Sequence, residues 1–218
     1  MSVLDGKVAV VTGASRGIGA ATVRVLTQGG ARVAGCARHA EADVLACDVS
    51  KPADVDRFVA EVLRRFGTPD VLVNNAGIVE RARLSEMSVP AWDAVVDANL
   101  KGTFLVTRGF LPGMRSRRSG RIINVASISG RQGTAGLTAY CAAKHGVVGL
   151  TRALAEELRE DGIAVNAVCP GSVDTAMLQA GMPGAEPEMS PDDVANVIIY
   201  LAAYAPLALT GSCVDVFG

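Results

Sequence analysis

The 218-residue chain has little of what several protein classes require. Only 4% of its residues are aromatic, and its 21 basic residues are balanced by 22 acidic ones, which gives a net charge of −1. This balance offers no electrostatic basis for nucleic acid as a partner. The longest apolar run, residues 197–209, is interrupted by Pro206 and is too short to cross a bilayer. We therefore expect neither a nucleic-acid partner nor a membrane partner.

Signals for secretion, disulfides and metals are also missing. Residues 1–7 lack the basic region and apolar core of a signal peptide. The five cysteines are odd in number and scattered, with no CxxC pair, and the two histidines show no ligand spacing. These patterns predict no disulfide framework and no metal site. A reducing, cytoplasmic location fits them best.

What the chain does have is apolar residues and glycine. Half of the residues are hydrophobic and 24 are glycine, enough for a sizeable core in one domain that spans residues 1–218. Short, continuous apolar runs recur along the chain and are typical of strands buried on both faces. They cover residues 7–12, 32–36, 44–47, 70–74, 121–126, 163–168 and 213–216.

Helical patterns lie between these runs. Apolar residues from Val55 to Phe66 recur at helical spacing, and Gly67 is placed to end that helix. Residues 190–193, Ser-Pro-Asp-Asp, resemble a capping box that opens a helix to about Tyr204. The alternation predicts the α/β class, a Rossmann-type doubly wound parallel sheet with helices on both faces.

One connection is abbreviated. Only residues 37–43 separate the second expected strand from the third, whereas a parallel crossover normally takes a dozen residues or more. Seven extended residues reach about 23 Å, against about 17 Å for a five-residue strand. The chain can therefore return without a helix, which leaves that face of the sheet less covered.

The first chemical signal is a glycine-rich turn, TGASRGIG at residues 12–19, between the first strand and the first helix. Glycines there allow a tight turn and a close approach of the backbone to a pyrophosphate. The helix N-terminus then offers unpaired N–H groups and a partial positive charge. A purely structural turn is the alternative interpretation, and the position after an N-terminal strand favours the binding one.

The second signal is the sequence YCAAK, with Tyr140 and Lys144 four residues apart at the start of a helix that runs to about Glu160. Residues at this spacing share one helical face. A neighbouring cation favours the phenolate and lowers the pKa of a tyrosine, so Tyr140 could exchange a proton near neutral pH. Seen in isolation, the pair could also be an ordinary exposed one.

Polar residues also follow neighbouring strands. Ser127 ends one strand, the sequence NNAG at residues 74–77 ends another, and Asn99 lies in the helical region between them. The carboxyl ends of neighbouring strands are where open α/β sheets bind ligands. Each residue alone could be a turn or cap residue, but together they indicate a site.

With these motifs in view, the sequence resembles the short-chain dehydrogenase/reductase family, of the short single-domain type, and is similar to its 3-oxoacyl carrier-protein reductases. The motifs stand in family order: TGASRGIG (12–19), Asp48 after the third strand, NNAG (74–77), Asn99, Ser127, YCAAK (140–144) and PGSVDT (170–175). They span nearly the whole chain, and their joint match is highly specific.

The resemblance implies roles for the matching positions. Tyr140 would be the acid in reduction and the base in oxidation, Lys144 would lower the Tyr140 pKa, and Ser127 would hydrogen-bond the substrate oxygen. Asn99 would help to hold a water relay that reaches Lys144, and Asp48 would accept a hydrogen bond from the adenine amino group. The implied cofactor-binding residues are Gly13, Ser15, Arg16, Gly17, Ile18, Gly19, Arg38, Asp48, Val49, Asn75, Ala76, Gly77, Tyr140, Lys144, Pro170, Gly171, Val173 and Thr175.

The choice of cofactor follows from charge. An NAD site usually places an acid at the end of the second strand, but this chain has Cys-Ala-Arg there and no acid before Glu41. Arg16 and Arg38 could clamp a 2′-phosphate, so we predict NADP(H) rather than NAD(H). The alternative is that both arginines are solvated surface residues.

The substrate and the partners are less clearly marked. A short lid at about residues 176–189 carries Met177, Leu178, Met182 and Met189, which fit either an apolar substrate or the core. The basic run at residues 115–118 resembles the surface by which the family's carrier-protein reductases meet an acyl carrier protein. Asp161 departs from that pattern, and a solvated helix end is the alternative.

The sequence thus predicts an NADP(H)-dependent oxidoreductase that interconverts a carbonyl and a secondary alcohol, with a 3-oxoacyl thioester or a small apolar ketone as substrate. The rival hypothesis is a dinucleotide-binding redox sensor or scaffold with weak or no turnover. Self-association to a homodimer or homotetramer is expected through helices around residues 99–115 and 140–160. An apolar stripe on the second helix supports this, formed by Gly146, Val147, Leu150, Leu154 and Leu158.

Overall fold

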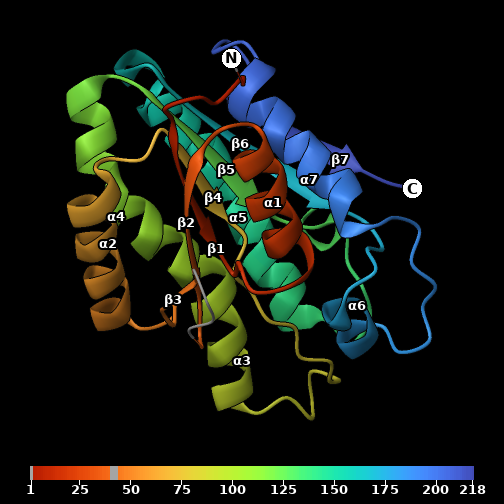
Figure 1. The fold of residues 1–218 in the computed structure, drawn as a ribbon. Coiled ribbons are helices and arrows are strands. Elements are labelled where there is room, and N and C mark those ends of the chain that lie inside the picture. Colours follow the sequence, from red (N-terminus) through yellow and green to blue (C-terminus); the bar gives the residue numbers. More distant parts are fainter. Residues whose placement is uncertain (1, 40–43) are drawn as a thin grey trace.

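The computed structural model describes residues 2–39 and 44–218. Its centre is one seven-stranded sheet in the order β3-β2-β1-β4-β5-β6-β7, and every pair of neighbours is parallel (Figure 1). This confirms the doubly wound parallel sheet. The strands are β1 (Val8–Thr12), β2 (Arg32–Ala37), β3 (Val44–Ala46), β4 (Val71–Asn74), β5 (Gly120–Val125), β6 (Ile163–Pro170) and β7 (Cys213–Val216).

Helices cover both faces of the sheet (Figure 1). On one face lie α1 (Gly17–Gln28) and α7 (Pro191–Ile199), packed against each other and against the sheet. On the other face lie α2 (Pro52–Phe66), α4 (Gly102–Arg117) and α5 (Thr138–Glu157). A π-helical turn, Asp97–Lys101, joins α3 (Val89–Val96) to α4, and α6 (Ala176–Gly181) is a short helix beside the cleft. In the described chain, no helix combines the length and apolarity needed to cross a membrane.

The helix ends follow the sequence signals. Gly67 ends α2 with φ +80°, a left-handed conformation that favours glycine. At the start of α7, Ser190 and Asp193 form the expected capping box, with Pro191 in the first turn. A π-helical turn then continues α7 to Tyr204, so this helical segment ends where the sequence predicted.

The abbreviated connection joins two strands that pair directly. β2 ends at Ala37 and β3 begins at Val44, and Gly35 lies opposite Val44 in parallel register. Within this connection, residues 40–43 lie outside the described residues. Val33 and Val44 pack against the core on the α1 side but remain only partly buried. This partial exposure agrees with a sheet face that has less helical cover at this edge.

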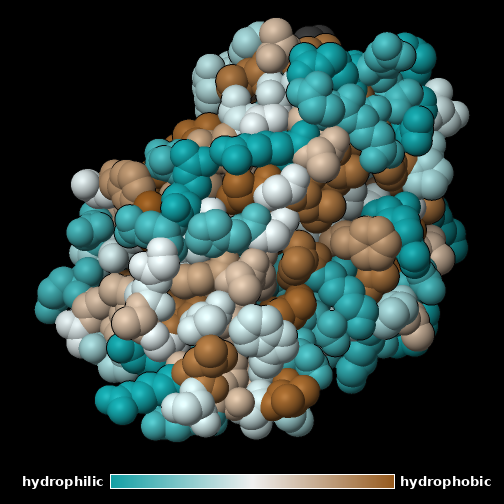
Figure 2. Space-filling model, turned by 180° about the vertical axis from the view of Figure 1, so that it is seen from behind, coloured by the Kyte–Doolittle hydropathy of each residue, from teal (hydrophilic) through white to brown (hydrophobic). Residues whose placement is uncertain are grey.

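The apolar stripe expected on α5 is divided between core and surface: Val147 and Leu158 are buried, whereas Gly146, Leu150 and Leu154 are only partly buried. Val147 is 1% exposed and Leu158 is 0% exposed, because both pack inside the chain. The exposed side of α5 instead carries small and polar residues such as His145 and Gly149. Figure 2 shows the side of the molecule hidden in Figure 1, where hydrophobic residues gather in separate patches among polar ones.

A chain of buried polar side chains ties two strands to two helices. The Asn74 Nδ2 atom donates to Thr107 Oγ1 of α4 at 2.9 Å and to Asn124 Oδ1 of β5 at 2.9 Å. Asn124 Nδ2 in turn donates to Thr151 Oγ1 of α5 at 2.9 Å. All four residues are buried, so each group depends on its neighbour for a hydrogen bond. The chain fixes Asn74, which directly precedes the polar turn at residues 75–77.

We expect Asn124→Ala to lower the free energy of unfolding by about 1–3 kcal/mol. The substitution removes one hydrogen bond from the buried Asn74 Nδ2 atom and one from the buried Thr151 Oγ1 atom. Urea unfolding measures the change. Arg57→Ala, which breaks an exposed ion pair with Asp54, is the control and should change stability by less than about 1 kcal/mol. Equal losses in the two variants would contradict a special role for the buried chain.

Candidate active site

The carboxyl ends of β1, β4, β5 and β6 open into one cleft with a volume of about 1090 Å³. This is the edge at which open parallel sheets bind ligands. Eighteen of the residues predicted from the sequence line the cleft: Gly13, Ser15, Arg16, Gly17, Ile18, Arg38, Asp48, Val49, Asn75, Ala76, Gly77, Ser127, Tyr140, Lys144, Pro170, Gly171, Val173 and Thr175.

Two predicted residues, Gly19 and Asn99, lie behind the cleft wall. Both are buried, and neither lines the cleft. A Cβ atom on Gly19 would lie 2.0 Å from the Gly13 carbonyl oxygen, so this glycine is required for close packing of the turn. Gly19 thus shapes the turn from beneath, and its contact with the cofactor stays a prediction.

The glycine-rich turn is fastened to the turn after β4. Thr12 Oγ1 accepts hydrogen bonds from the backbone N–H groups of Asn75 and Ala76, both at 3.0 Å. In return, the Asn75 side chain donates to the carbonyl oxygens of Thr12 at 2.9 Å and Gly13 at 3.1 Å. These four bonds hold two segments, 60 residues apart in the sequence, as one rigid wall of the cleft.

The N-terminus of α1 fits the phosphates of a dinucleotide. Arg16 occupies the N-cap position without a side-chain capping bond, and the first turn contains no acidic residue. Its N–H groups and the positive end of the helix dipole are therefore available to an anion. Gly13 and Gly17 both have positive φ, +67° and +54°, which a glycine adopts without strain.

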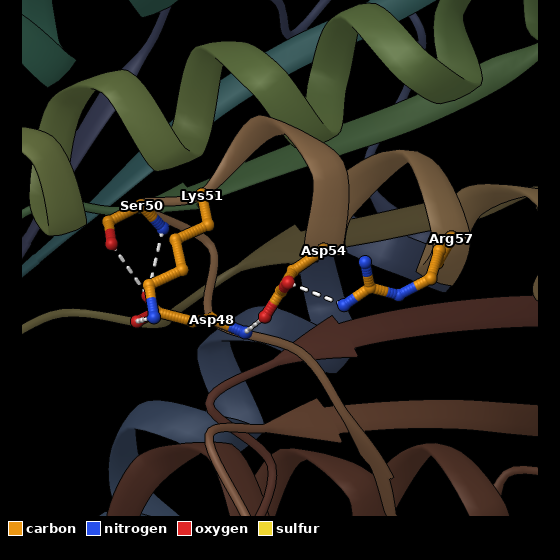
Figure 3. Close-up of polar contacts among 5 residues, drawn as sticks. All are labelled: Asp48, Ser50, Lys51, Asp54 and Arg57. Carbon is orange, nitrogen blue, oxygen red and sulfur yellow. Dashed lines mark hydrogen bonds and ion pairs between the residues drawn. The ribbon is translucent and has the colours of Figure 1, made fainter.

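After β3, Asp48 is held in place by the start of α2 (Figure 3). Its Oδ1 atom accepts hydrogen bonds from the Ser50 hydroxyl at 2.7 Å and the Ser50 N–H at 3.1 Å, and Lys51 Nζ lies 3.8 Å from Oδ2. The Asp54 carboxylate accepts from the Asp48 N–H at 3.2 Å, which lowers the Asp54 pKa. Asp48 therefore presents one well-anchored acceptor to the cleft.

Ser127, Tyr140 and Lys144 converge on the floor of the cleft. Ser127 starts the 3₁₀ turn Ile128–Gly130 and accepts a hydrogen bond from the Ser129 N–H at 3.1 Å. The Tyr140 hydroxyl lies 3.8 Å from the Met177 sulfur of α6. Lys144 Nζ lies 5.5 Å from the centre of the Tyr140 ring and donates to the Val125 carbonyl oxygen at 2.8 Å.

The expected lowering of the Tyr140 pKa is not found in this structure. Burial of the phenol raises its pKa to about 12, against a smaller lowering by the hydrogen bond from Ser127. The neighbouring Lys144 ammonium group, which donates to the Val125 carbonyl oxygen, does not offset this effect of burial. Burial also lowers the pKa of Lys144 to about 8. Burial thus disfavours the charged form of both side chains, the phenolate of Tyr140 and the ammonium group of Lys144.

Asn99 supports this group from the π-helical turn between α3 and α4. Its Nδ2 atom donates to the carbonyl oxygens of Ile78 at 2.7 Å and Val95 at 2.8 Å, whereas its buried Oδ1 atom has no partner in the described chain. A Cβ atom on Gly77 would lie 2.4 Å from that oxygen and 3.8 Å from Lys144 Nζ. Gly77 is therefore needed to leave room between Asn99 and Lys144.

Some side chains of the lid at residues 176–189 line the cleft, and others are buried in the core. Met177, Leu178 and Met182 line the cleft, as expected for substrate contacts, whereas Met189 is buried in the core. The lid begins with α6, which was expected as a loop. Further residues line the cleft although no motif in the sequence marks them, among them Ile78, Val79, Gln132, Thr134 and Leu137.

A parallel sheet with a phosphate-binding turn after β1 and a serine, a tyrosine and a lysine at its carboxyl edge defines a dinucleotide-dependent oxidoreductase. The family model for short chain dehydrogenase matches residues 7–184. A putative ketoacyl reductase from Streptomyces coelicolor is 38% identical, with 100% of this chain and 98% of the relative covered. A 3-oxoacyl-(acyl-carrier-protein) reductase from Thermotoga maritima is also 38% identical, at 99% and 98% coverage. The chain therefore belongs to the short-chain dehydrogenase/reductase family and uses a nicotinamide dinucleotide.

Solved structures show the same fold. A ligand-free aldohexose dehydrogenase from Thermoplasma acidophilum superimposes with a TM-score of 0.90 at 30% identity, with 99% of this chain and 94% of that chain covered. A Brucella melitensis protein described as ribose-5-phosphate isomerase gives 0.93 at 34% identity, with 99% and 92% covered. The alignment with the Streptomyces relative spans 257 positions, more than the 218 residues of this chain, so that relative contains extra segments.

The buried Lys144 predicts an unusual dependence of stability on pH. Its pKa of about 8 lies below the ordinary 10.5, so between these values the unfolded chain binds a proton that the folded chain has lost. Stability should therefore rise with pH in this window, by at most about 3 kcal/mol. Lys144→Met should flatten the rise between pH 8 and pH 9.5, below the range in which Tyr140 titrates, as measured by urea unfolding. An unchanged slope would show that another group titrates.

Proposed function

We propose that the protein is an NADP(H)-dependent oxidoreductase that interconverts a carbonyl compound and a secondary alcohol. The observation that carries the proposal is the convergence of Ser127, Tyr140 and Lys144 on one cleft beside a phosphate-binding turn. The substrate is a 3-oxoacyl thioester or a small apolar ketone, since methionine and leucine side chains of the lid line the cleft. Similarity to ketoacyl reductases supports this class of substrate.

The nicotinamide ring, when bound, supplies or accepts the hydride. In reduction, the Tyr140 hydroxyl gives its proton to the substrate oxygen, and the raised Tyr140 pKa keeps that proton in place at neutral pH. The Ser127 hydroxyl donates a hydrogen bond to the same oxygen and stabilises the negative charge that develops there. Lys144 would hold the cofactor ribose beside these two hydroxyl groups, since it lines the same cleft.

Tyr140→Phe separates catalysis from binding, because it removes one hydroxyl and keeps the ring. We expect NADPH oxidation across a panel of 3-oxoacyl thioesters, diketones, quinones, aldehydes and cyclic ketones to show one active class. In the variant, kcat should fall by about 10²–10⁴ with NADPH binding retained. Absorbance of NADPH measures turnover, and fluorescence titration measures binding.

The rival hypothesis, a redox sensor or scaffold, predicts the opposite result. NADPH would bind tightly, every substrate would be left unreduced, and Tyr140→Phe would change nothing. Residual turnover that is the same in the parent protein and the variant would also contradict Tyr140 as the proton donor. The buried, correctly placed Asn99, Ser127, Tyr140 and Lys144 favour the enzyme over this rival.

The preference for NADP(H) rests on Arg16 and Arg38. Both are exposed and line the cleft, one at the start of α1 and the other just after β2. Within residues 2–39 and 44–218, neither arginine has a carboxylate within ion-pair distance. Two arginines can bind a 2′-phosphate through charge-assisted hydrogen bonds.

Arg38→Asp should therefore weaken NADPH binding about 10–100-fold, because it replaces a phosphate donor by a repelling carboxylate, and should leave NADH binding nearly unchanged. The ratio of kcat/KM for the two cofactors, together with fluorescence titration, measures the effect. Arg83→Asp makes the same charge change at an exposed position that does not line the cleft. An NADPH/NADH ratio that is unchanged in Arg38→Asp would refute the assignment.

The expected carrier-protein surface is occupied by contacts within the chain. Arg115 Nε lies 2.8 Å from the Asp161 carboxylate, Arg117 donates to the Pro69 carbonyl oxygen at 2.7 Å, and Arg118 donates to the Glu160 carbonyl oxygen. Docking of an acidic carrier here would have to compete with these contacts. We therefore propose a free small-molecule substrate rather than one presented by an acyl carrier protein. Self-association stays a prediction that light scattering can check.

A further inference from the structure

A second cavity of about 430 Å³ shares part of its lining with the cleft. Thr134 and Met182 line both the cleft and this cavity, so the two are continuous in their lining. Ser127, Tyr140 and Lys144 line the main cleft, and none of the three lines the second cavity. Its lining residues are Arg81, Thr134, Ala135, Met182, Pro183, Gly184 and Ala185. The only cation among them is Arg81.

The Arg81 side chain is held in one place although it is exposed. Its Nη1 atom donates to the Gly181 carbonyl oxygen at the end of α6, at 3.0 Å. Its Cγ and Cζ atoms lie 3.5 Å from the position that a Cβ atom on Gly136 would occupy, so the side chain lies across that glycine. The backbone is fixed as well, because the Ala82 N–H donates to the Gly136 carbonyl oxygen at 3.0 Å. The guanidinium group is thus preorganised.

The charge of Arg81 is not neutralised within the described chain. No carboxylate of those residues lies within ion-pair distance of it, and no acidic residue lines the second cavity. A guanidinium group has five N–H donors, and the bond to Gly181 uses one. The remaining donors can bind a planar or tetrahedral anion at two points.

We propose that Arg81 binds an anionic group, a carboxylate or a phosphate, at the end of the substrate remote from the reacting carbonyl. This inference rests on the proposed reductase function and narrows its substrate class to carbonyl compounds with a short apolar stretch and an anionic end. The lid residues Met177 and Met182 contact the apolar stretch, and Arg81 fixes its far end. Arg81 is then a specificity-determining residue, outside the proton-transfer group.

A purely structural role makes a different prediction. If Arg81 serves only to fasten α6 to the turn before α5, its loss loosens the lid for every substrate alike. If it binds an anion, its loss affects only substrates that carry one. A matched set of ketones separates the two roles: 5-oxohexanoate, 4-oxopentyl phosphate and the neutral methyl 5-oxohexanoate have the same number of methylene groups, and longer members of each series can be compared.

The experiment measures kcat and KM with NADPH for the parent protein, Arg81→Gln and Arg81→Lys. We expect Arg81→Gln to raise KM for the anionic ketones about 10–100-fold with little change in kcat, and to leave the methyl ester unaffected. Arg81→Lys should recover part of the affinity. Added salt should raise KM for the anionic ketones in the parent protein and in Arg81→Lys, but not in Arg81→Gln. Arg83→Gln, in the same loop but outside both cavities, is the control.

A second readout does not need turnover. The anionic ketones should stabilise the parent protein against heat, and the methyl ester should stabilise it less; Arg81→Gln should abolish the difference. Turnover of all three ketones with equal losses in Arg81→Gln would overturn the anion site and leave the reductase in place. Anion-dependent stabilisation that needs Arg81, without turnover of any ketone, would support the site and overturn the reductase. Neither turnover nor anion-dependent stabilisation would overturn both.

Discussion

The parallel pairing of β1, β4, β5 and β6 is the constraint on which the rest of the structure depends. Because the four strands run in one direction, the turns that follow them meet at one edge, and residues far apart in the sequence become neighbours. The contact is close: the Asn75 side chain bonds to two carbonyl oxygens of the glycine-rich turn, and Gly19 leaves no room for a Cβ atom. The close packing of these backbone turns therefore sets the shape of the cleft.

The same burial that builds the core sets the proton chemistry of the site. Tyr140 and Lys144 are both buried, so the pKa of the phenol rises and the pKa of the ammonium group falls. A phenol kept protonated suits proton donation, and a lysine that loses charge easily destabilises the fold at neutral pH. A bound cofactor that gives Lys144 hydrogen-bond partners would offset this cost, which links occupancy of the site to stability. A trade-off between activity and stability is common at active sites.

The link between β2 and β3 is brief, and the lid consists of a six-residue helix and a loop. The Streptomyces coelicolor relative contains extra segments, since its alignment with this chain spans 257 positions. Arginines that resembled a carrier-protein surface are used within the chain, where Arg115 pairs with Asp161. Arg81, in contrast, lies unpaired within the described chain beside an open cavity. In our proposal, the substrate is therefore recognised by charge at Arg81, beside the cleft.

Local signals in the sequence predict the strands, most of the helix ends and nearly all of the motif residues that line the cleft. These signals are the apolar runs, the caps Gly67 and Ser190, and the glycines of the turn after β1. Features that depend on burial and on distant neighbours appear only in the folded chain. Folding buries the Tyr140 hydroxyl, so that its pKa rises instead of falling, and it places Val147 of α5 and Leu158, the residue after α5, in the core. Folding also brings the Arg81 side chain next to Gly136 and Gly181. No local sequence pattern predicts this contact, because hydrogen bonds and desolvation depend on neighbours in space and not on neighbours along the chain.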